Sequence, residues 1–233
     1  MRAMILAAGR GERMRPLTDR TPKVLLPVGG KPLVQWHVEK LWRAGFDQIV
    51  INHAWLGEQI ERALGNGARF GPRISYSAEA QALETAGGIS KALPLLGTQP
   101  FLVVNGDIFT DFDFVQLVPR LGSLAADGKL AHLVLIDNPP HHPNGDFALR
   151  ETRVEAEGDV RLTFSGIGIY QPELFASVAA GGRAQLAPLL RAAMGERRVG
   201  GERYAGMWFD VGTPERLTEL NHMLADPSSS ECA

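Results

Sequence analysis

Residues 1–13 read Met-Arg-Ala-Met-Ile-Leu-Ala-Ala-Gly-Arg-Gly-Glu-Arg. The apolar side chains of residues 3–6 predict a short buried strand, and the glycines at positions 9 and 11 predict a tight turn directly after it. The apolar run is too short for a signal peptide or for a membrane span, which needs about 20 apolar residues. The chain is therefore expected to begin with a buried strand that enters a glycine-rich turn.

Beyond this stretch, strand-length apolar runs alternate with helical patterns. Helices are predicted over 33–44, ended by Gly45, over 56–64, ended by Gly65, and over 86–93, stopped before Pro94. Strands are predicted over 48–51, 73–77, 101–104 and 130–136, and a last helix from Pro214 to about Leu224. This alternation is typical of βαβ units, so we expect an α/β protein with a Rossmann-like, mainly parallel mixed sheet flanked by helices.

The pattern changes in the second half of the chain. A loop rich in Pro, His, Asn and Gly is predicted over 138–145, and short strands over 146–170 indicate a small β subdomain. We find no internal repeat and no hexapeptide pattern of a β-helix. One domain is therefore expected over 1–226, in halves of about 1–107 and 108–226, with a flexible tail over 227–233.

Composition and charge exclude several classes of protein. Apolar residues make up 45% and charged residues 21% of the chain, which is ordinary for a globular protein. A net charge of -2 argues against a general electrostatic grip on nucleic acid. The single cysteine, Cys232, excludes an internal disulfide and a cysteine-based metal site. We therefore expect a cytoplasmic protein that binds neither nucleic acid nor a membrane.

The glycine-rich turn is also rich in arginine, and Pro22-Lys23 follows it. Glycines let backbone N–H groups approach phosphate oxygens, while Arg13 and Lys23 add cationic donors for a triphosphate. The turn lacks the third glycine of Gly-x-Gly-x-x-Gly and the Gly-Lys-Ser/Thr end of a Walker loop. The segment suits a polyanion, but it is neither a dinucleotide fingerprint nor a P-loop.

This extended pattern resembles the signature of the sugar-1-phosphate nucleotidylyltransferases, Gly-x-Gly-x-Arg with a downstream Pro-Lys. Residues 83–88, 105–107 and 208–213 resemble later motifs of the same family, in the same order. The resemblance covers most of the chain and implies the nucleotide-diphospho-sugar transferase fold, with a nucleotide-binding first half and a second half for the sugar phosphate and metal. The nucleotide-binding residues that it implies are Ala7, Ala8, Gly9, Gly11, Glu12, Arg13, Lys23, Glu79, Thr85 and Gly88, with Arg13 and Lys23 as the catalytic residues.

By the same resemblance, Asp107 and Asp210 hold Mg²⁺ between them and the triphosphate. The implied reaction is a direct displacement, in which an oxygen of the sugar 1-phosphate attacks the α-phosphorus of the nucleotide and pyrophosphate leaves. A phosphate monoester has a second pKa of about 6, so the nucleophile is already anionic near neutral pH and needs no general base. The protein has to position two polyanions and neutralise charge on the leaving group.

The resemblance places Glu79 at the base. A carboxylate accepts the N3–H of uracil or thymine, or the N1–H of guanine, so UTP, dTTP and GTP all stay open. The compact length and the segments 84–88, 105–107 and 165–170 resemble most the uridylyltransferases of peptidoglycan recycling that act on N-acetylmuramic acid 1-phosphate. The sugar-binding residues that this implies, in the β subdomain and beside it, are Asn105, Asp146, Ser165 and Gly166.

The chain departs from the family at residues 161–164, Arg-Leu-Thr-Phe, where the family has a Glu-Lys-Pro motif. The lactyl carboxylate of a muramate sugar requires a nearby cation, for which Arg150, Arg153 and Arg203 are candidates, while the His141-His142 pair is expected to face water. Two alternatives remain: a mannose- or glucose-1-phosphate nucleotidylyltransferase, and a non-catalytic sensor of nucleotide sugars. The expected partners are an NTP and a sugar 1-phosphate, bound by a monomer or small homo-oligomer.

Overall fold

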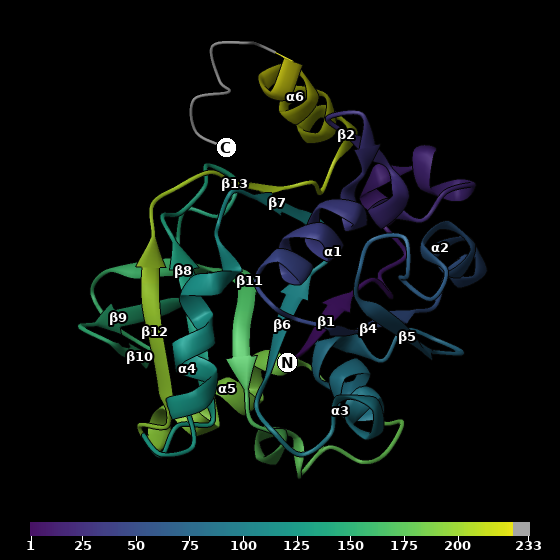
Figure 1. Cartoon of the computed structure of the whole chain (residues 1–233). Helices are drawn as coiled ribbons and strands as arrows, with labels where there is room; N and C mark the ends of the chain where they lie inside the picture. Colours follow the sequence, from purple (N-terminus) through teal and green to yellow (C-terminus); the bar gives the residue numbers. More distant parts are fainter. Residues whose placement is uncertain (226–233) are drawn as a thin grey trace.

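The strand predicted from residues 3–6 is β1 (Arg2–Leu6), in a computed structural model that describes residues 1–225 (Figure 1). It pairs in parallel with β4 (Gln48–His53) on one side and with β6 (Phe101–Asn105) on the other. β5 (Arg73–Ala78) extends this parallel part beyond β4. The strands predicted for the first half of the chain are confirmed, with small shifts at their ends.

The second half of the chain continues the same sheet, whose order within the described residues is β5-β4-β1-β6-β11-β8-β12-β10-β9. β11 (Arg161–Tyr170) is antiparallel to β6 and to β8 (Ala131–Ile136), and β12 (Val199–Tyr204) is parallel to β8. The far edge is an antiparallel hairpin of β9 (Phe147–Arg150) and β10 (Arg153–Glu155). The sheet is therefore mixed, and its parallel pairs are concentrated in the first half.

Helices cover both faces of this sheet, as the alternation of helical and strand patterns predicts. Side chains along β1 alternate: Ala3 and Ile5 lie in the core that α1 and α2 cover, and Met4 lies in the core that α3 and α5 cover. Each fully buried side chain of the size of Ile5 or Met4 contributes about 1.5–3 kcal/mol. The helices are α1 (Leu33–Arg43), α2 (Gly57–Leu64), α3 (Glu84–Leu96), α4 (Val118–Ser123), α5 (Leu186–Gly195) and α6 (Pro214–Ala225).

The predicted end of α3 before Pro94 is wrong, because the helix continues to Leu96. A proline inside a helix removes one backbone hydrogen bond. Leu96, however, is fully buried in the core, and Gly97 ends the helix at φ 80° with its N–H bonded to the Leu93 carbonyl at 2.8 Å. Burial of the last turn outweighs the missing bond.

The predicted β subdomain takes a different form from the one expected. Its strands do not form a sheet of their own, since β9 and β10 are the edge of the main sheet and β11 lies near its middle. The register of β11 against β8 shifts between Phe164 and Ile167, where Gly166 has φ 82°, a conformation that favours glycine. This bulge lies beside Asn105, at the end of β6.

Two short strand pairs lie outside the main sheet. One joins β7 (Ile108–Thr110) to β13 (Trp208–Asp210), and the other joins β2 (Pro27–Val28) to β3 (Lys31–Pro32). The helix predicted after Thr213 is confirmed as α6, whereas the predicted tail over 227–233 lies outside the described residues. Within residues 1–225 no helix has the length and hydropathy of a membrane span.

Candidate active site

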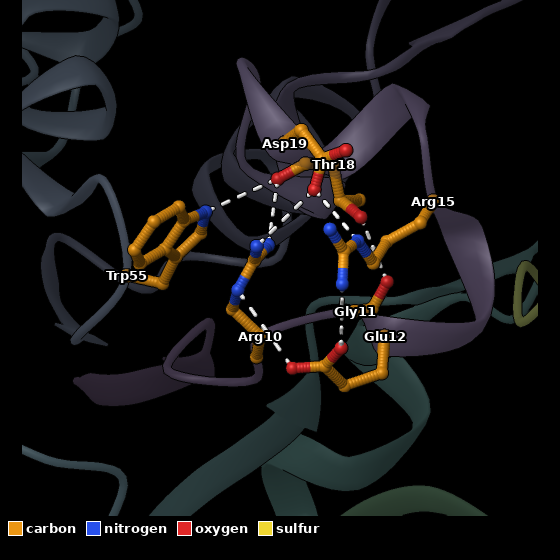
Figure 2. A network of polar contacts seen from close by, with 7 residues as sticks. All are labelled: Arg10, Gly11, Glu12, Arg15, Thr18, Asp19 and Trp55. Carbon is orange, nitrogen blue, oxygen red and sulfur yellow. Dashed lines mark hydrogen bonds and ion pairs between the residues drawn. The ribbon is translucent and has the colours of Figure 1, made fainter.

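The turn after β1 is held by a network around Arg10, which Figure 2 shows. Its guanidinium donates to the Thr18 carbonyl at 2.8 Å and to Asp19 Oδ1 at 3.3 Å, and it stacks 3.8 Å above the ring of Trp55. The Trp55 indole N–H donates to the same Thr18 carbonyl at 3.1 Å. Gly11 takes φ 70°, and a Cβ there would lie 3.0 Å from Thr18 Cγ2. The turn is therefore folded back onto residues 18–19 and braced by the loop after β4.

The charged residues of the turn divide into two groups. Glu12 forms ion pairs with Arg10 at 3.8 Å and with Arg15 at 4.0 Å, and Arg15 also donates to Asp19 at 2.8 Å. Arg13, by contrast, is exposed and has no hydrogen bond or ion pair with another of the residues 1–225. It lines a cavity, so it is the cation of the turn that is available to a ligand.

A first cavity of about 290 Å³ opens where the turn meets the carboxyl ends of β1, β4 and β6. This is the edge at which open α/β sheets bind ligands. Several of the predicted nucleotide-binding residues meet there, together with Asn52 at the end of β4. The lining residues are Leu6, Ala7, Ala8, Gly9, Lys23, Val24, Asn52, Ala82, Glu84, Thr85, Asn105, Asp107 and Arg183.

Lys23 and Asp107 form an ion pair in this cavity, with 2.7 Å between Nζ and Oδ2. The lysine side chain is only 9% exposed, whereas the aspartate side chain is 39% exposed. Because the ammonium lies in a partly desolvated place, it interacts more strongly with anions than a surface lysine would. The fold thus brings Lys23 of the Pro-Lys motif into contact with Asp107, which follows the end of β6.

A second cavity of about 330 Å³ shares Asn105 and Asp107 with the first. Asp210 enters it because β13 pairs with β7, which sets Asp210 opposite Ile108, and because the Val211 N–H bonds to the Asp107 carbonyl at 2.9 Å. The two predicted metal ligands therefore line one cavity. The whole lining is Arg13, Asn105, Asp107, Ile108, His141, His142, Thr163, Phe164, Ser165, Trp208 and Asp210.

The arrangement of carboxylates fits a divalent cation in chemical terms. Asp107 and Asp210 supply hard oxygen ligands, and no group of three or more His, Cys, Asp or Glu that could hold a metal exists within residues 1–225. Mg²⁺ typically uses one or two carboxylates and fills its remaining positions with water and substrate phosphates. Two carboxylates that face one cavity therefore suit a Mg²⁺ that is bound jointly by the protein and by substrate phosphates.

Three residues in contact with the carboxylates of this region were missed by the sequence: His141 and His142, which line the second cavity, and Arg216, which does not line it. Arg216 of α6 donates from Nη1 to Asp210 Oδ2 at 2.6 Å, and His141 Nε2 lies 3.6 Å from the same oxygen. Burial, and after it the charge of Arg216, lowers the pKa of His141. His142 Nε2 contacts Asp146 Oδ1 at 3.1 Å. The histidines thus do more than face water, but no spacing in the sequence ties 141–142 to 210.

Glu79, which is expected at the base, does not line the first cavity. It is buried, with 5% of its surface exposed, and it lies behind Asn52. Its Oε1 accepts from Asn52 Nδ2 at 2.7 Å, its Oε2 accepts from the Leu83 N–H at 2.9 Å, and Asn52 Oδ1 accepts from the Ala7 N–H at 2.9 Å. A Cβ at Gly88 would lie 2.7 Å from Asn52 Nδ2, so this glycine makes room for the pair. Asn52 is the side chain that reaches the cavity.

The predicted sugar-binding residues lie around a third cavity of about 270 Å³ and the second one. Asn105 lines both, Asp146 lines the third, and Ser165 lines the second, although its hydroxyl donates to the Val134 carbonyl at 2.7 Å. Gly166 packs on Asn105, since a Cβ there would lie 2.6 Å from Asn105 Nδ2. The four residues are brought together, but Ser165 and Gly166 contribute mainly backbone and shape.

The three arginines predicted for a lactyl carboxylate lie elsewhere. Arg150 and Arg153 both pair with Glu155, and Arg203 pairs with Asp137 at 2.6 Å. None of the three lines the three cavities described above. The three arginines lie on strands β9, β10 and β12, toward the edge of the sheet formed by the second half of the chain.

Comparison with known proteins agrees with this geometry. Residues 2–226 match the nucleotidyl transferase family. The chain is 59% identical, over 94% of its length and 96% of the relative's, to an N-acetylmuramate alpha-1-phosphate uridylyltransferase of Neisseria meningitidis, and 32% identical over 96% and 97% to the Caulobacter vibrioides enzyme of that name. A UTP–glucose-1-phosphate uridylyltransferase of Synechocystis is 40% identical over 51% of the chain and 33% of the relative.

A solved structure shares the fold. It is a Bacillus anthracis protein provisionally described as a glucose-1-phosphate thymidylyltransferase, with a TM-score of 0.84 at 23% identity over 97% of this chain and 96% of that one. The family match and the near full-length relatives make the classification plain. The chain belongs to the nucleotidyl transferase family and is a sugar-1-phosphate nucleotidylyltransferase.

Proposed function

We propose that the chain transfers a uridylyl group from UTP to N-acetylmuramic acid α-1-phosphate, giving the UDP-sugar and pyrophosphate, as a step of peptidoglycan recycling. The observation that carries the proposal is 59% identity, along nearly the whole of both chains, to an enzyme described by that activity. A second enzyme of the same description is also covered nearly end to end. The two cavities at the carboxyl edge of the sheet, which share Asn105 and Asp107, offer room for two substrates.

Binding of the two polyanions is the work of the turn after β1 and of the Lys23–Asp107 pair. The backbone of residues 7–9 cradles the triphosphate, and Arg13, which has no partner of its own within residues 1–225, neutralises it from the second cavity. Lys23 adds a partly desolvated ammonium in the first cavity, beside Asp107, which lines both. The sugar phosphate is already anionic, so the residues orient it and take no proton from it.

Asp107 and Asp210 would hold Mg²⁺, the cation that we propose for this site. When bound, it neutralises phosphate charge as pyrophosphate leaves. The nucleotide base lies toward Asn52 and Thr85, with Glu79 holding Asn52, and the sugar lies toward Asn105 and Asp146. A cytoplasmic location and a monomer or small homo-oligomer remain predictions of the sequence.

The test combines each of several nucleotides with each of several sugar 1-phosphates. UTP, dTTP, GTP, CTP and ATP are each combined with the 1-phosphates of N-acetylmuramic acid, N-acetylglucosamine, glucose and mannose, and pyrophosphate release is followed with Mg²⁺. The highest kcat/KM is expected for UTP with the muramate sugar. A higher kcat/KM for glucose or mannose 1-phosphate would identify the chain as a glucose- or mannose-1-phosphate nucleotidylyltransferase. No turnover with any pair of substrates would favour a non-catalytic sensor of nucleotide sugars.

A further inference from the structure

Both carboxylates proposed to hold the metal already have a cationic partner. Asp107 is paired with Lys23 at 2.7 Å, and Asp210 is paired with Arg216 at 2.6 Å. Lys23 belongs to the signature that the sequence shows, whereas no motif predicts Arg216. The second pair therefore needs an explanation of its own.

The Asp210–Arg216 pair is well defined and sheltered. Arg216 Nη1 donates to Asp210 Oδ2 and, at 3.3 Å, to the carbonyl of the same residue, and it lies 3.0 Å from His141 Nε2. The side chains of the pair are only 18% and 20% exposed. Solvent and salt screen such a pair much less than a surface pair.

The turn between β13 and α6 is shaped around this pair. A Cβ at Gly212 would lie 2.9 Å from Arg216 Nη2 and 2.9 Å from Asp210 Oδ1, so a larger residue would collide with both partners. Thr213 Oγ1 accepts from the Arg216 N–H at 3.4 Å, which fixes the start of the helix that carries the arginine. The glycine of the Gly-Thr segment thus leaves the space that the ion pair fills.

Charge is balanced where the cation is expected to bind. Two carboxylates face two fixed cations, and Arg13 adds a further positive charge to the same cavity. A divalent cation that enters the free protein meets carboxylates that are already neutralised, and it is repelled by Lys23 and Arg216 at short range. The phosphates of the substrates would bring the negative charge that is missing.

We propose that Arg216 is a charge-balancing residue, which holds Asp210 in the free enzyme and keeps its affinity for divalent cations low until the anionic substrates arrive. The inference rests on the proposed metal site at Asp107 and Asp210. Arg216 acts through Asp210 and is a positioning residue. Its removal should strengthen metal binding to the free protein, which loss of a purely structural residue would not do.

The experiment titrates the nucleotide-free protein with Mn²⁺ and measures unbound Mn²⁺ by electron paramagnetic resonance. Arg216→Gln should bind Mn²⁺ about tenfold more tightly than the wild type, because one cation facing Asp210 is gone. Arg216→Lys keeps the charge and should stay near the wild type. Adding Asp210→Asn to Arg216→Gln should remove the gain.

Arg203→Gln is the matched control, since it also removes an arginine that pairs with an aspartate at 2.6 Å, away from the cavities. It should leave Mn²⁺ binding unchanged, and circular dichroism should show every variant folded. An unchanged or weaker affinity in Arg216→Gln, or an equal gain in Arg216→Lys or Arg203→Gln, overturns the inference.

The outcome also separates this inference from the proposed metal site. If the gain of Arg216→Gln persists in the double variant with Asp210→Asn, the cation does not bind at Asp210, and both the assignment and the inference fail. If Asp210→Asn weakens Mn²⁺ binding while Arg216→Gln leaves it unchanged, the metal site stands and the inference alone fails.

Discussion

At the scale of single residues, side chains that line the cavities are held by other side chains that do not line them. Glu79 shows this most clearly, because its two oxygens are bonded to Asn52 and to the Leu83 N–H, and the cavity is reached by Asn52. A buried hydrogen bond to a charged group contributes about 1.5–3 kcal/mol. Glu79 therefore fixes Asn52, and through it the N–H of Ala7.

Glu79→Gln distinguishes support from base reading. The amide cannot accept from both Asn52 and Leu83, so we expect the KM for UTP to rise roughly tenfold as Asn52 loses its orientation. The ratio of kcat/KM for UTP over dTTP and GTP should stay within about twofold of wild type, since the residue does not line the cavity. A change in this ratio would show that Glu79 takes part in recognition of the base.

His37 gives the fold a dependence on pH. It is fully buried, its Nε2 lies 2.8 Å from the Ile108 carbonyl, and its Nδ1 has no partner within residues 1–225. Burial lowers the pKa of His37 from its usual 6.5 to about 4. The folded protein therefore keeps the ring neutral under conditions in which the unfolded chain protonates it.

The direction of this pH dependence follows from the number of protons that the unfolded and folded states bind. Between pH 6.5 and about 4 the unfolded chain binds more protons at His37, so the free energy of unfolding falls as the pH falls through this window, by up to about 3 kcal/mol. Urea unfolding of wild type and His37→Gln at a series of pH values should show a smaller slope in the variant. Equal slopes would remove His37 as the cause.

At the scale of elements, the turn after β1 is a braced loop rather than a flexible one. Arg10 joins it to residues 18–19 and to Trp55, which follows β4 (Figure 2). Stacking of a cation on an aromatic ring contributes about 0.5–1 kcal/mol at exposed sites, and the hydrogen bonds add a similar amount. The brace orders the backbone of the turn, including the N–H groups proposed to bind the triphosphate.

Loss of this brace should weaken nucleotide binding more than turnover. Arg10→Ala and Trp55→Ala are each expected to raise the KM for UTP roughly fivefold to tenfold with a smaller effect on kcat, and the double variant should show less than the sum of the two free energies. Arg69→Ala is the control, because Arg69 stacks on Phe70 at 4.5 Å outside the three cavities. Full additivity would mean that Arg10 and Trp55 act separately.

At the scale of the whole molecule, the two halves of the chain share one sheet. β6 of the first half pairs with β11 of the second, and Leu102, Val104, Ile167 and Ile169 are all buried at or beside this junction. Asn105 ends β6 at the same junction and lines all three cavities. The two halves of the chain, and the cavities at their junction, are therefore joined by continuous backbone hydrogen bonding.

A fragment of residues 1–107 should consequently fail to fold alone. It would expose the apolar edge of β6 and lose the partner strand of the central sheet. We expect the purified fragment to lack a cooperative thermal transition by circular dichroism, while the full chain shows one. A cooperative transition in the fragment would make the first half an independent domain.

The sequence by itself determined the local parts of this protein. The alternation of apolar patterns gave the strands and helices of the first half, and Gly11 with Arg13 and Lys23 indicated a polyanion site, because periodicity and turn chemistry are properties of neighbouring residues. The resemblance to a family supplied Asp107 and Asp210. The resemblance did not show that Lys23 forms an ion pair with Asp107 or that Arg216 forms one with Asp210.

Only the tertiary structure decided the contacts between distant segments. Helix α3 runs past Pro94 because Leu96 is buried in the core, Glu79 accepts a hydrogen bond from Asn52, and His141 lies near Asp210. Each of these depends on the register of the sheet and on which helix covers which face. Such contacts join residues that no local pattern links, so they appear only when the chain is folded.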